Sequence, residues 1–265
     1  MKVLLLNGSP RAGGATTALL GALAKGMGDA GAQTRTVELR SLDLRDCIGC
    51  YNCWVRTPGC CAQQDAMETL LPEYAAADLL VFGTPLYVFG MTGLMKVFFD
   101  RTLPLIEPWL MAGADGLTTH PKRHPRANRP QAILVSPCGF PERAHFDALV
   151  ATFRLMAARL GWDWRGELLR PGAEPLSIAS LRPLLAPYLA LVAEAGAALV
   201  REGGIPPALE AALRRDLFPG GPEAFRAVAN QSWTEAMERW QVPAAARQPP
   251  PLRTEDLGAA LTTAG

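Results

Sequence analysis

The N-terminal segment restricts the fold of this chain more than any other feature, because an apolar run, a glycine-containing loop and a helical pattern follow one another directly. Residues 2–7 read Lys-Val-Leu-Leu-Leu-Asn and are followed by Gly-Ser-Pro. A short apolar run that ends at turn residues is typical of a buried parallel strand. From Thr16 to Met27 apolar residues recur at helical spacing. This order predicts a strand, a loop and a helix that packs against the sheet.

Strand-like and helix-like segments continue to alternate along the chain. The pattern predicts further strands at 33–39, 78–87, 131–136 and 162–169. It predicts the intervening helices at about 64–77, 93–103 and 145–160. Such alternation indicates an α/β fold, here a doubly wound five-stranded parallel sheet.

We expect the chain to divide into two regions. Residues 1–200 would form the sheet domain. Residues 201–265 would form a helical extension, with helices at 206–217 and 222–240 and a Pro- and Ala-rich tail from Pro243. The connection 104–130 is long for a structureless loop, so it is either a solvated surface loop or a functional segment that could cover a substrate site.

Charge and hydropathy exclude several classes of partner. Lys and Arg number 26 against 25 Asp and Glu, which gives a net charge of +1. No net electrostatic attraction to nucleic acid or to an anionic membrane is therefore expected. The apolar stretch Val3 to Leu6 is too short for a signal sequence or a membrane span. We expect a cytoplasmic protein that has neither a nucleic acid nor a membrane as its partner.

The loop between the first strand and the first helix carries the first chemical signal. Helix N-terminal amides favour a phosphate, and glycine lets the backbone approach it closely. A triphosphate-binding loop would need a Lys and a hydroxyl residue after its second glycine, but Gly14 and Ala15 follow Gly13. The loop instead offers hydroxyls, one guanidinium and backbone amides, which suit a single phosphomonoester, from Ser9, Arg11, Gly14, Thr16 and Thr17.

A second glycine pattern, Gly-x-Gly-x-x-Gly at Gly26, Gly28 and Gly31, matches the dinucleotide-binding motif in letters only. It follows a predicted helix and precedes a predicted strand, which is the reverse of the order that this motif requires. We interpret these glycines as the C-terminal cap of the helix.

Three motifs together resemble the NADPH-dependent FMN reductase family of flavodoxin-like proteins. They are Gly8-Ser-Pro-Arg11 with Gly14 and Thr16, the segment Pro85-Leu-Tyr-Val-Phe-Gly90, and Lys96 to Asp100-Arg101 in the next helix. The resemblance covers residues 1–200. It implies a flavodoxin-like fold with the strand order 2-1-3-4-5, and FMN bound beyond the carboxyl ends of the strands. It also implies NAD(P)H as reductant and a small electron acceptor such as a quinone, a flavin or another organic molecule.

The resemblance also implies which residues bind the flavin. The phosphate would contact the first loop, at Ser9, Arg11, Gly14, Thr16 and Thr17. The ring would contact two later loops, at Pro85, Leu86, Tyr87, Val88, Phe89, Gly90, Ser136, Cys138 and Gly139. Many family members carry Asn after the glycine of the phosphate loop, whereas this chain has Ala15. One hydrogen bond to the phosphate is therefore expected to be missing, and no catalytic side chain is assigned.

Five of the six cysteines crowd between residues 47 and 61. Cys47, Cys50, Cys53 and Cys60 form a C-x2-C-x2-C-x6-C pattern, which resembles the cluster motif of iron-sulfur flavoproteins. The resemblance implies a 4Fe-4S cluster, with Cys61 as an alternative fourth ligand. Metal-free thiols, a zinc site and a disulfide stay open. A cluster would make an electron carrier between redox partners the alternative function. Because the segment follows the second strand at a carboxyl end, we expect it to approach the flavin, across a subunit contact if not within one chain.

The family's flavin sites commonly lie at subunit contacts, so the resemblance implies a homodimer or a homotetramer. We interpret the aromatic residues Phe98, Phe99 and Trp109 as exposed and as candidates for such a contact.

Overall fold

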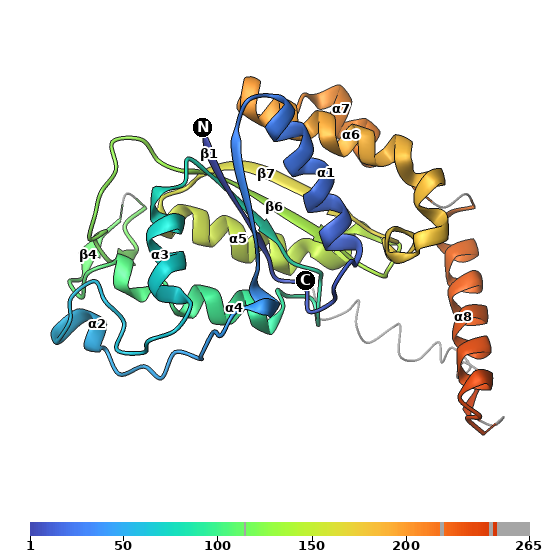
Figure 1. Ribbon diagram of the computed structural model, residues 1–265, viewed down its shortest axis with the longest axis horizontal. Helices are drawn as coiled ribbons and strands as arrows, with labels where there is room; N and C mark the ends of the chain where they lie inside the picture. Colours follow the sequence, from blue (N-terminus) through green and yellow to red (C-terminus); the bar gives the residue numbers. More distant parts are fainter. Residues whose placement is uncertain (114, 218–219, 244–245, 248–265) are drawn as a thin grey trace. The chain divides into compact units, whose positions relative to one another are not determined.

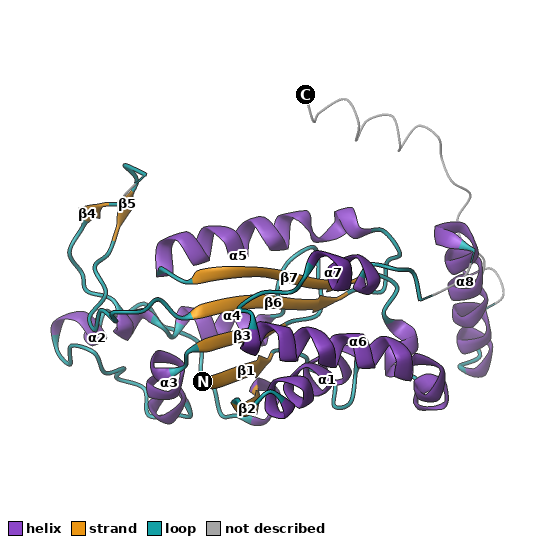
Figure 2. Ribbon diagram, turned by 90° about the horizontal axis from the view of Figure 1, so that it is seen from above, coloured by secondary structure: helices purple, strands orange, loops and turns teal. Residues whose placement is uncertain are grey.

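The computed structural model describes residues 1–113, 115–217, 220–243 and 246–247. Its main sheet (Figure 1) has five parallel strands, which Figure 2 shows in the order β2-β1-β3-β6-β7. The strands are β1 (Lys2–Asn7), β2 (Gln33–Glu38), β3 (Leu79–Gly83), β6 (Gln131–Pro137) and β7 (Asp163–Arg170). Counted among these five, the order is 2-1-3-4-5, so the predicted flavodoxin-like fold class is confirmed.

Helices cover both faces of this sheet (Figure 2). One face carries α1 (Ala15–Asp29) and α6 (Arg182–Arg201), and the other carries α3 (Met67–Ala76), α4 (Gly93–Asp100) and α5 (Asp147–Leu160). Alternation along β1 explains the two cores: Val3 and Leu5 face α1 and α6, whereas Leu4 and Leu6 face the other three helices. The two cores are therefore built on opposite sides of the same strands.

Short elements occupy the connections between the main strands and helices. Four of them precede β6: a single helical turn α2 (Asn52–Val55), the 3-10 turns η1 (Leu39–Ser41) and η2 (Leu103–Leu105), and the hairpin β4 (Met111–Ala112) with β5 (Thr118–Thr119). Three more 3-10 turns follow: η3 (Arg143–Phe146), η4 (Glu174–Ser177) and η5 (Ala179–Leu181). The hairpin lies inside the long connection 104–130.

The helix α6 was not predicted, and it completes the layer that α1 begins. A Cβ on Gly26 would lie 1.7 Å from the carbonyl oxygen of Ala193, and one on Gly196 would lie 2.2 Å from that of Leu23. The two helix backbones therefore meet where both carry glycine. Within α6, Pro183–Arg201 is long and apolar enough to cross a membrane, with a mean hydropathy of 1.7, but its apolar residues also form the core with α1.

Two sequence interpretations need correction. Gly26 and Gly28 lie inside α1, and Gly26 serves helix packing; only Gly31, with φ +90°, fits the expected cap, where its amide bonds to the carbonyl of Gly28. Phe98 and Phe99 are buried in the core rather than exposed, and Trp109 alone of that group is exposed, by 70%. Both phenylalanines lie on the buried face of α4, whose exposed positions are Gly93, Lys96 and Asp100.

Contacts divide the chain into two compact units, 1–217 and 218–265. The first unit contains the sheet and also α7 (Pro207–Leu213), which contacts α6. The second contains α8 (Gly221–Arg239). Most of the Pro- and Ala-rich tail expected from Pro243 lies outside the described residues.

Candidate functional site

The loop between β1 and α1 is held in place by the buried side chain of Asn7. Its amide nitrogen donates to the hydroxyl of Thr17 at 3.0 Å and to the carboxylate of Glu38 at 3.0 Å, and its oxygen accepts from the amide of Ser9 at 3.0 Å. The Ser9 hydroxyl accepts in turn from the amide of Arg11 at 3.2 Å. Asn7 therefore fixes the loop, although the sequence analysis assigned it no role.

A small cavity of about 80 Å³ lies beside this loop, at the carboxyl ends of the strands. It brings together residues predicted from all three loops: Ser9, Arg11, Gly14, Thr16, Pro85, Leu86, Tyr87, Cys138 and Gly139. The convergence follows from topology, because β1, β3 and β6 are neighbours and their carboxyl ends meet at one edge of the sheet.

Five predicted residues do not line this cavity. Thr17 turns toward Asn7, and the hydroxyl of Ser136 is buried with no hydrogen-bond partner among the described residues. Val88, Phe89 and Gly90 form a turn whose two ends, Tyr87 and Gly90, bond to each other's carbonyls at 3.0 Å. These three residues form the tip of the loop after β3, beyond the cavity itself.

The tip of that loop is strained. Val88 has φ +47° and Phe89 has φ +59°, which is the left-handed region that side chains disfavour, a β-branched one most of all. Val88 is 95% exposed and Phe89 52% exposed. At the base of the loop, the Thr92 hydroxyl donates to the Gly8 carbonyl at 2.7 Å and ties this loop to the phosphate loop.

The sequence analysis missed a fourth loop, which follows β7. It contributes Ala173, Glu174 and Ser177 to the cavity, and the Ser177 hydroxyl accepts from the amide of Ala15 at 3.1 Å. Pro137 and Ala15 are further lining residues that were not predicted. The sequence could have indicated this loop by its position, because it directly follows the fifth strand and so also lies at the carboxyl ends of the strands.

The charges around the cavity are mixed. The Arg11 guanidinium lies 3.9 Å from the Glu174 carboxylate, and both side chains are more than half exposed. Gly14 caps α1 without a side-chain hydrogen bond, and no acidic residue occupies the first turn, so apart from the Ala15 amide, which donates to Ser177, this helix N-terminus is available to an anion. Burial raises the pKa of Cys138, whose sulfur accepts from the Phe140 amide, so this residue stays a neutral thiol.

The cysteine segment lies at the opposite edge of the sheet from this cavity. The Trp54 indole donates to the carbonyl of Leu103 at 3.2 Å, and Arg101, just past the end of α4, bonds to the Arg45 carbonyl at 2.6 Å. Because α4 begins at Thr92 beside Gly8 and runs about 12 Å, Arg101 is remote from the phosphate loop. In Figure 2, α2 and the β4–β5 hairpin lie at the end where β1 starts.

All six cysteines are free thiols in this structure. Cys47, Cys50 and Cys60 are exposed, Cys61 is partly buried and Cys53 is buried. Burial raises the pKa of Cys53, and of the neighbouring thiols Cys61 raises it most, ahead of Cys50 and Cys47. Cys61 also interacts with the Arg101 guanidinium. The segment is thus anchored at its C-terminal side, where Cys61 rather than Cys60 turns inward.

A model of the NADPH-dependent FMN reductase family matches residues 1–155, which is more than half of the chain. The chain belongs to this family. The resemblance that the three motifs indicated is therefore confirmed.

Curated relatives of this FMN reductase family member are similar to it over part of its sequence. An iron-sulfur flavoprotein of Methanocaldococcus jannaschii is 33% identical over 105 residues, which are 40% of this chain and 53% of the relative. An iron-sulfur flavoprotein of Clostridioides difficile is 36% identical over 112 residues, 40% of this chain and 48% of the relative. The chain thus spans about half the length of these curated relatives.

A solved structure shows the same fold. It is an FMN-dependent NADH-azoreductase from Bacillus anthracis in complex with FMN, with a TM-score of 0.54 and 13% identity, covering 76% of this chain and all of that one. At this identity the likeness concerns the fold alone.

The residues of this FMN reductase family member fit one of the two implied groups. The cavity presents an open helix N-terminus, the Arg11 guanidinium and the hydroxyls of Ser9 and Thr16, which suit the phosphate of FMN. The thiols have the chemistry of cluster ligands, but among the described residues no group of three or more His, Cys, Asp or Glu side chains is arranged to hold a metal. No reaction step is therefore derived through a cluster.

Proposed function

We propose that this protein is an FMN-dependent NAD(P)H oxidoreductase that passes electrons from a nicotinamide to a small acceptor such as a quinone, a flavin or another organic molecule. The observation that carries the proposal is the convergence of the loops after β1, β3 and β6 on one polar cavity at the N-terminus of α1. Family membership of residues 1–155 supports it. When bound, FMN would supply the ring that accepts a hydride, and the protein would set its position and surroundings.

Within this proposal, different residues bind the phosphate of FMN, its ring, and the nicotinamide or acceptor. Arg11, Thr16 and the amides at the start of α1 hold the phosphate. Leu86 and Tyr87, which also line the cavity, would contact the ring. Beyond the loop tip, the His145 ring lies 4.7 Å from that of Phe140 and 5.9 Å from that of Phe89, and this exposed aromatic cluster is where we place the nicotinamide or the acceptor.

The proposed activity is tested by following anaerobic NADH and NADPH oxidation by the FMN-loaded protein with a quinone or free flavin as acceptor. We expect catalytic turnover without any added reductase. If the flavin is reduced only when a separate reductase is supplied, the protein is an electron carrier and the proposed activity is wrong.

Replacing Arg11 by Ala should weaken FMN binding by about tenfold or more, because a charge-assisted hydrogen bond to the phosphate is lost. The exposure of the Arg11 side chain, 64%, places the effect at the low end of the range for such contacts. Titration of the apoprotein with FMN, followed by flavin fluorescence, measures the change. Unchanged affinity would remove the phosphate assignment.

The matched variant at the same cavity is Glu174→Gln, which should bind FMN more tightly, because the Glu174 carboxylate faces the site of a dianion. Asp29→Asn serves as the control for net charge, since Asp29 lies at the other end of α1 and pairs with Lys25. We expect FMN affinity to be unaltered in this control.

A second candidate function, an iron-sulfur flavoprotein that carries electrons, is favoured by the cysteine spacing and by relatives named iron-sulfur flavoproteins. The cysteine segment lies at the edge of the sheet opposite the flavin cavity, so a direct approach to the flavin of the same chain, as the sequence suggested, has no support in this structure. Under this second candidate, we propose a homodimer or homotetramer in which the segment meets the flavin of another subunit.

For this second candidate, the inward position of Cys61 gives a specific expectation about the fourth ligand. After anaerobic reconstitution, Cys61→Ser should lose most of its iron and acid-labile sulfide, as should Cys50→Ala, whereas Cys60→Ser should retain them. FMN content should be the same in all three variants. Iron and sulfide near zero in the unaltered protein would leave a flavin reductase with metal-free thiols.

A further inference from the structure

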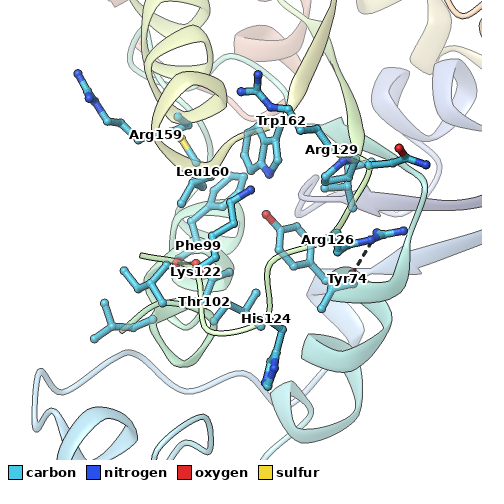
Figure 3. A pocket seen from close by; sticks show the side chains of 18 of the residues that line it. Tyr74, Phe99, Thr102, Lys122, His124, Arg126, Arg129, Arg159, Leu160 and Trp162 are labelled. Carbon is cyan, nitrogen blue, oxygen red and sulfur yellow. Dashed lines mark hydrogen bonds between the residues drawn. The ribbon is translucent and has the colours of Figure 1, made fainter. Parts of the chain in front are cut away.

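A second, larger cavity of about 360 Å³ opens at the edge of the sheet where the strands begin (Figure 3). Leu80 near the start of β3 lines it, as do Pro130 and Trp162, which immediately precede β6 and β7. Residues of 102–106 and 122–130, between α4 and β6, line the cavity together with residues of α3, α4 and α5. The cavity is therefore separate from the flavin cavity, which lies at the other ends of the same strands.

The deeper wall of this cavity is apolar and aromatic. Tyr74, Phe99 and Trp162 are buried, and Leu105, Met156 and Leu160 complete the surface. The side chains of Tyr74 and Trp162 share a hydrogen bond, and burial raises the pKa of Tyr74, so its hydroxyl stays neutral. A flat hydrophobic body could lie against this wall without leaving a charge buried beneath it.

The rim of the cavity is cationic, and two of its cations have no carboxylate partner in the described part of the chain. Figure 3 labels Lys122, Arg126, Arg129 and Arg159 around the aromatic side chains. Arg126 pairs with Asp78 and Arg159 with Asp115. Among the described residues, Lys122 and Arg129 form no ion pair, and both donate to the carbonyl of Gly161, at 3.4 Å and 3.2 Å.

Lys122 and Arg129 share the single carbonyl of Gly161, so most of their N–H donors form no hydrogen bond with it. Gly161 ends α5, so its carbonyl offers the two cations only the partial negative charge of a helix C-terminus. An ammonium and a guanidinium both carry further N–H donors. Burial, together with the charge of Arg129, lowers the pKa of Lys122. The acid Asp100 also lines the cavity, but Lys96 holds its carboxylate at 2.5 Å.

We propose that this cavity binds a small aromatic carboxylate, with the ring against Phe99 and Trp162 and the carboxylate between Lys122 and Arg129. The volume lies within the range of small-molecule sites, about 300–1,000 Å³. The aromatic wall favours a flat hydrophobic ligand, and Lys122 and Arg129 favour a ligand that carries a negative charge. Leu103, which lines the cavity, also accepts a hydrogen bond from Trp54 of the cysteine segment through its carbonyl.

The experiment is a calorimetric titration of the FMN-loaded protein with 2-naphthoate, with the uncharged 2-naphthalenemethanol as comparison. We expect saturable binding of 2-naphthoate, weakened by about tenfold or more in the double variant Lys122→Met/Arg129→Met. The control Lys25→Met/Arg201→Met removes the same charge from α1 and α6 on the opposite face, and it should bind 2-naphthoate as the unaltered protein does. The alcohol should bind more weakly than the acid.

A variant that fills the cavity tests the site without changing charge. Met156→Trp should abolish 2-naphthoate binding while thermal unfolding and the flavin absorbance spectrum stay those of the unaltered protein. No saturable binding, equal binding in the two double variants, or a flavin spectrum that shifts with 2-naphthoate would each overturn the proposal. The titration reads binding alone, so failure of the proposed redox activity would leave its outcome intact.

Discussion

Replacing Asp65 by Ala should lower the free energy of unfolding by about 3–5 kcal/mol, because the Arg101 guanidinium would stay buried without its counter-ion. The two side chains are 0% and 1% exposed. Arg101 donates to both carboxylate oxygens of Asp65, at 2.5 Å and 3.0 Å, and to the carbonyl of Arg45 at 2.6 Å. Urea unfolding followed by circular dichroism measures the loss.

The matched control for this ion pair is Asp100→Ala on α4. Asp100 pairs with Lys96 at 2.5 Å, but these side chains are 45% and 60% exposed, and exposed pairs contribute about 0–1 kcal/mol. If Asp65→Ala lowered the free energy of unfolding no more than this control does, the buried ion pair would not stabilise the fold.

The same ion pair makes stability depend on acid pH. Burial by itself would raise the pKa of Asp65, but hydrogen bonds from Arg101 and from the amides of Arg45 and Met67 hold it below its usual value of 3.8. A carboxyl whose pKa is depressed by folding stabilises the protein above its unfolded pKa, and this contribution is lost as the pH falls through the folded value. The unaltered protein should therefore lose stability more steeply below about pH 4 than Asp65→Ala.

The ion pair has a consequence for the cysteine segment, because it joins Arg45 and Asp65, on either side of the thiols, to the end of α4. Its loss should let the segment move away from η2, where Trp54 bonds to Leu103. We expect the thiol of Cys53, which is buried, to react faster with a thiol reagent in Asp65→Ala, while FMN affinity is unchanged.

The second large effect is expected at the contact between α1 and α6. Gly26→Ala should destabilise the protein by about 3 kcal/mol, at the upper end for overpacking, because the new Cβ meets the backbone of Ala193 rather than a flexible side chain. The helices must then separate, and α1 carries the phosphate loop at its N-terminus. FMN affinity should therefore fall together with stability.

The chain offers a control on the same helix. A Cβ on Gly21 meets nothing within 4 Å, so Gly21→Ala should stabilise the protein by about 0.5–1 kcal/mol through the lower conformational entropy of the unfolded chain. Gly196→Ala should resemble Gly26→Ala, since its Cβ would meet the Leu23 carbonyl. If Gly26→Ala and Gly21→Ala had the same effect, the close helix contact would not matter for stability.

The sequence was most informative where a signal is local. Buried strands such as β1 and β3 are continuous apolar runs, and the loops that follow them carry the glycine, proline and hydroxyl residues of a phosphate and ring site. Because parallel strands place their carboxyl ends at one edge, the pattern also predicted which loops would meet. The fold class and the family followed from these features and are confirmed.

Tertiary packing decided which residues from distant segments contact one another. The contact of Gly26 with Ala193, the ion pair of Asp65 with Arg101 and the approach of Glu174 to Arg11 each join residues far apart in the chain, and no local pattern marks them. The cysteine segment follows a carboxyl end but is held at the opposite edge of the sheet, because the buried charge of Arg101 requires the carboxylate of Asp65. The sequence by itself thus determined the strands of the sheet, the α/β class and the location of the flavin loops, since burial patterns and turn residues act locally. Only the tertiary structure placed the thiols, the fourth loop and the cationic cavity, since their positions depend on which distant backbones can pack and which buried charges must be paired.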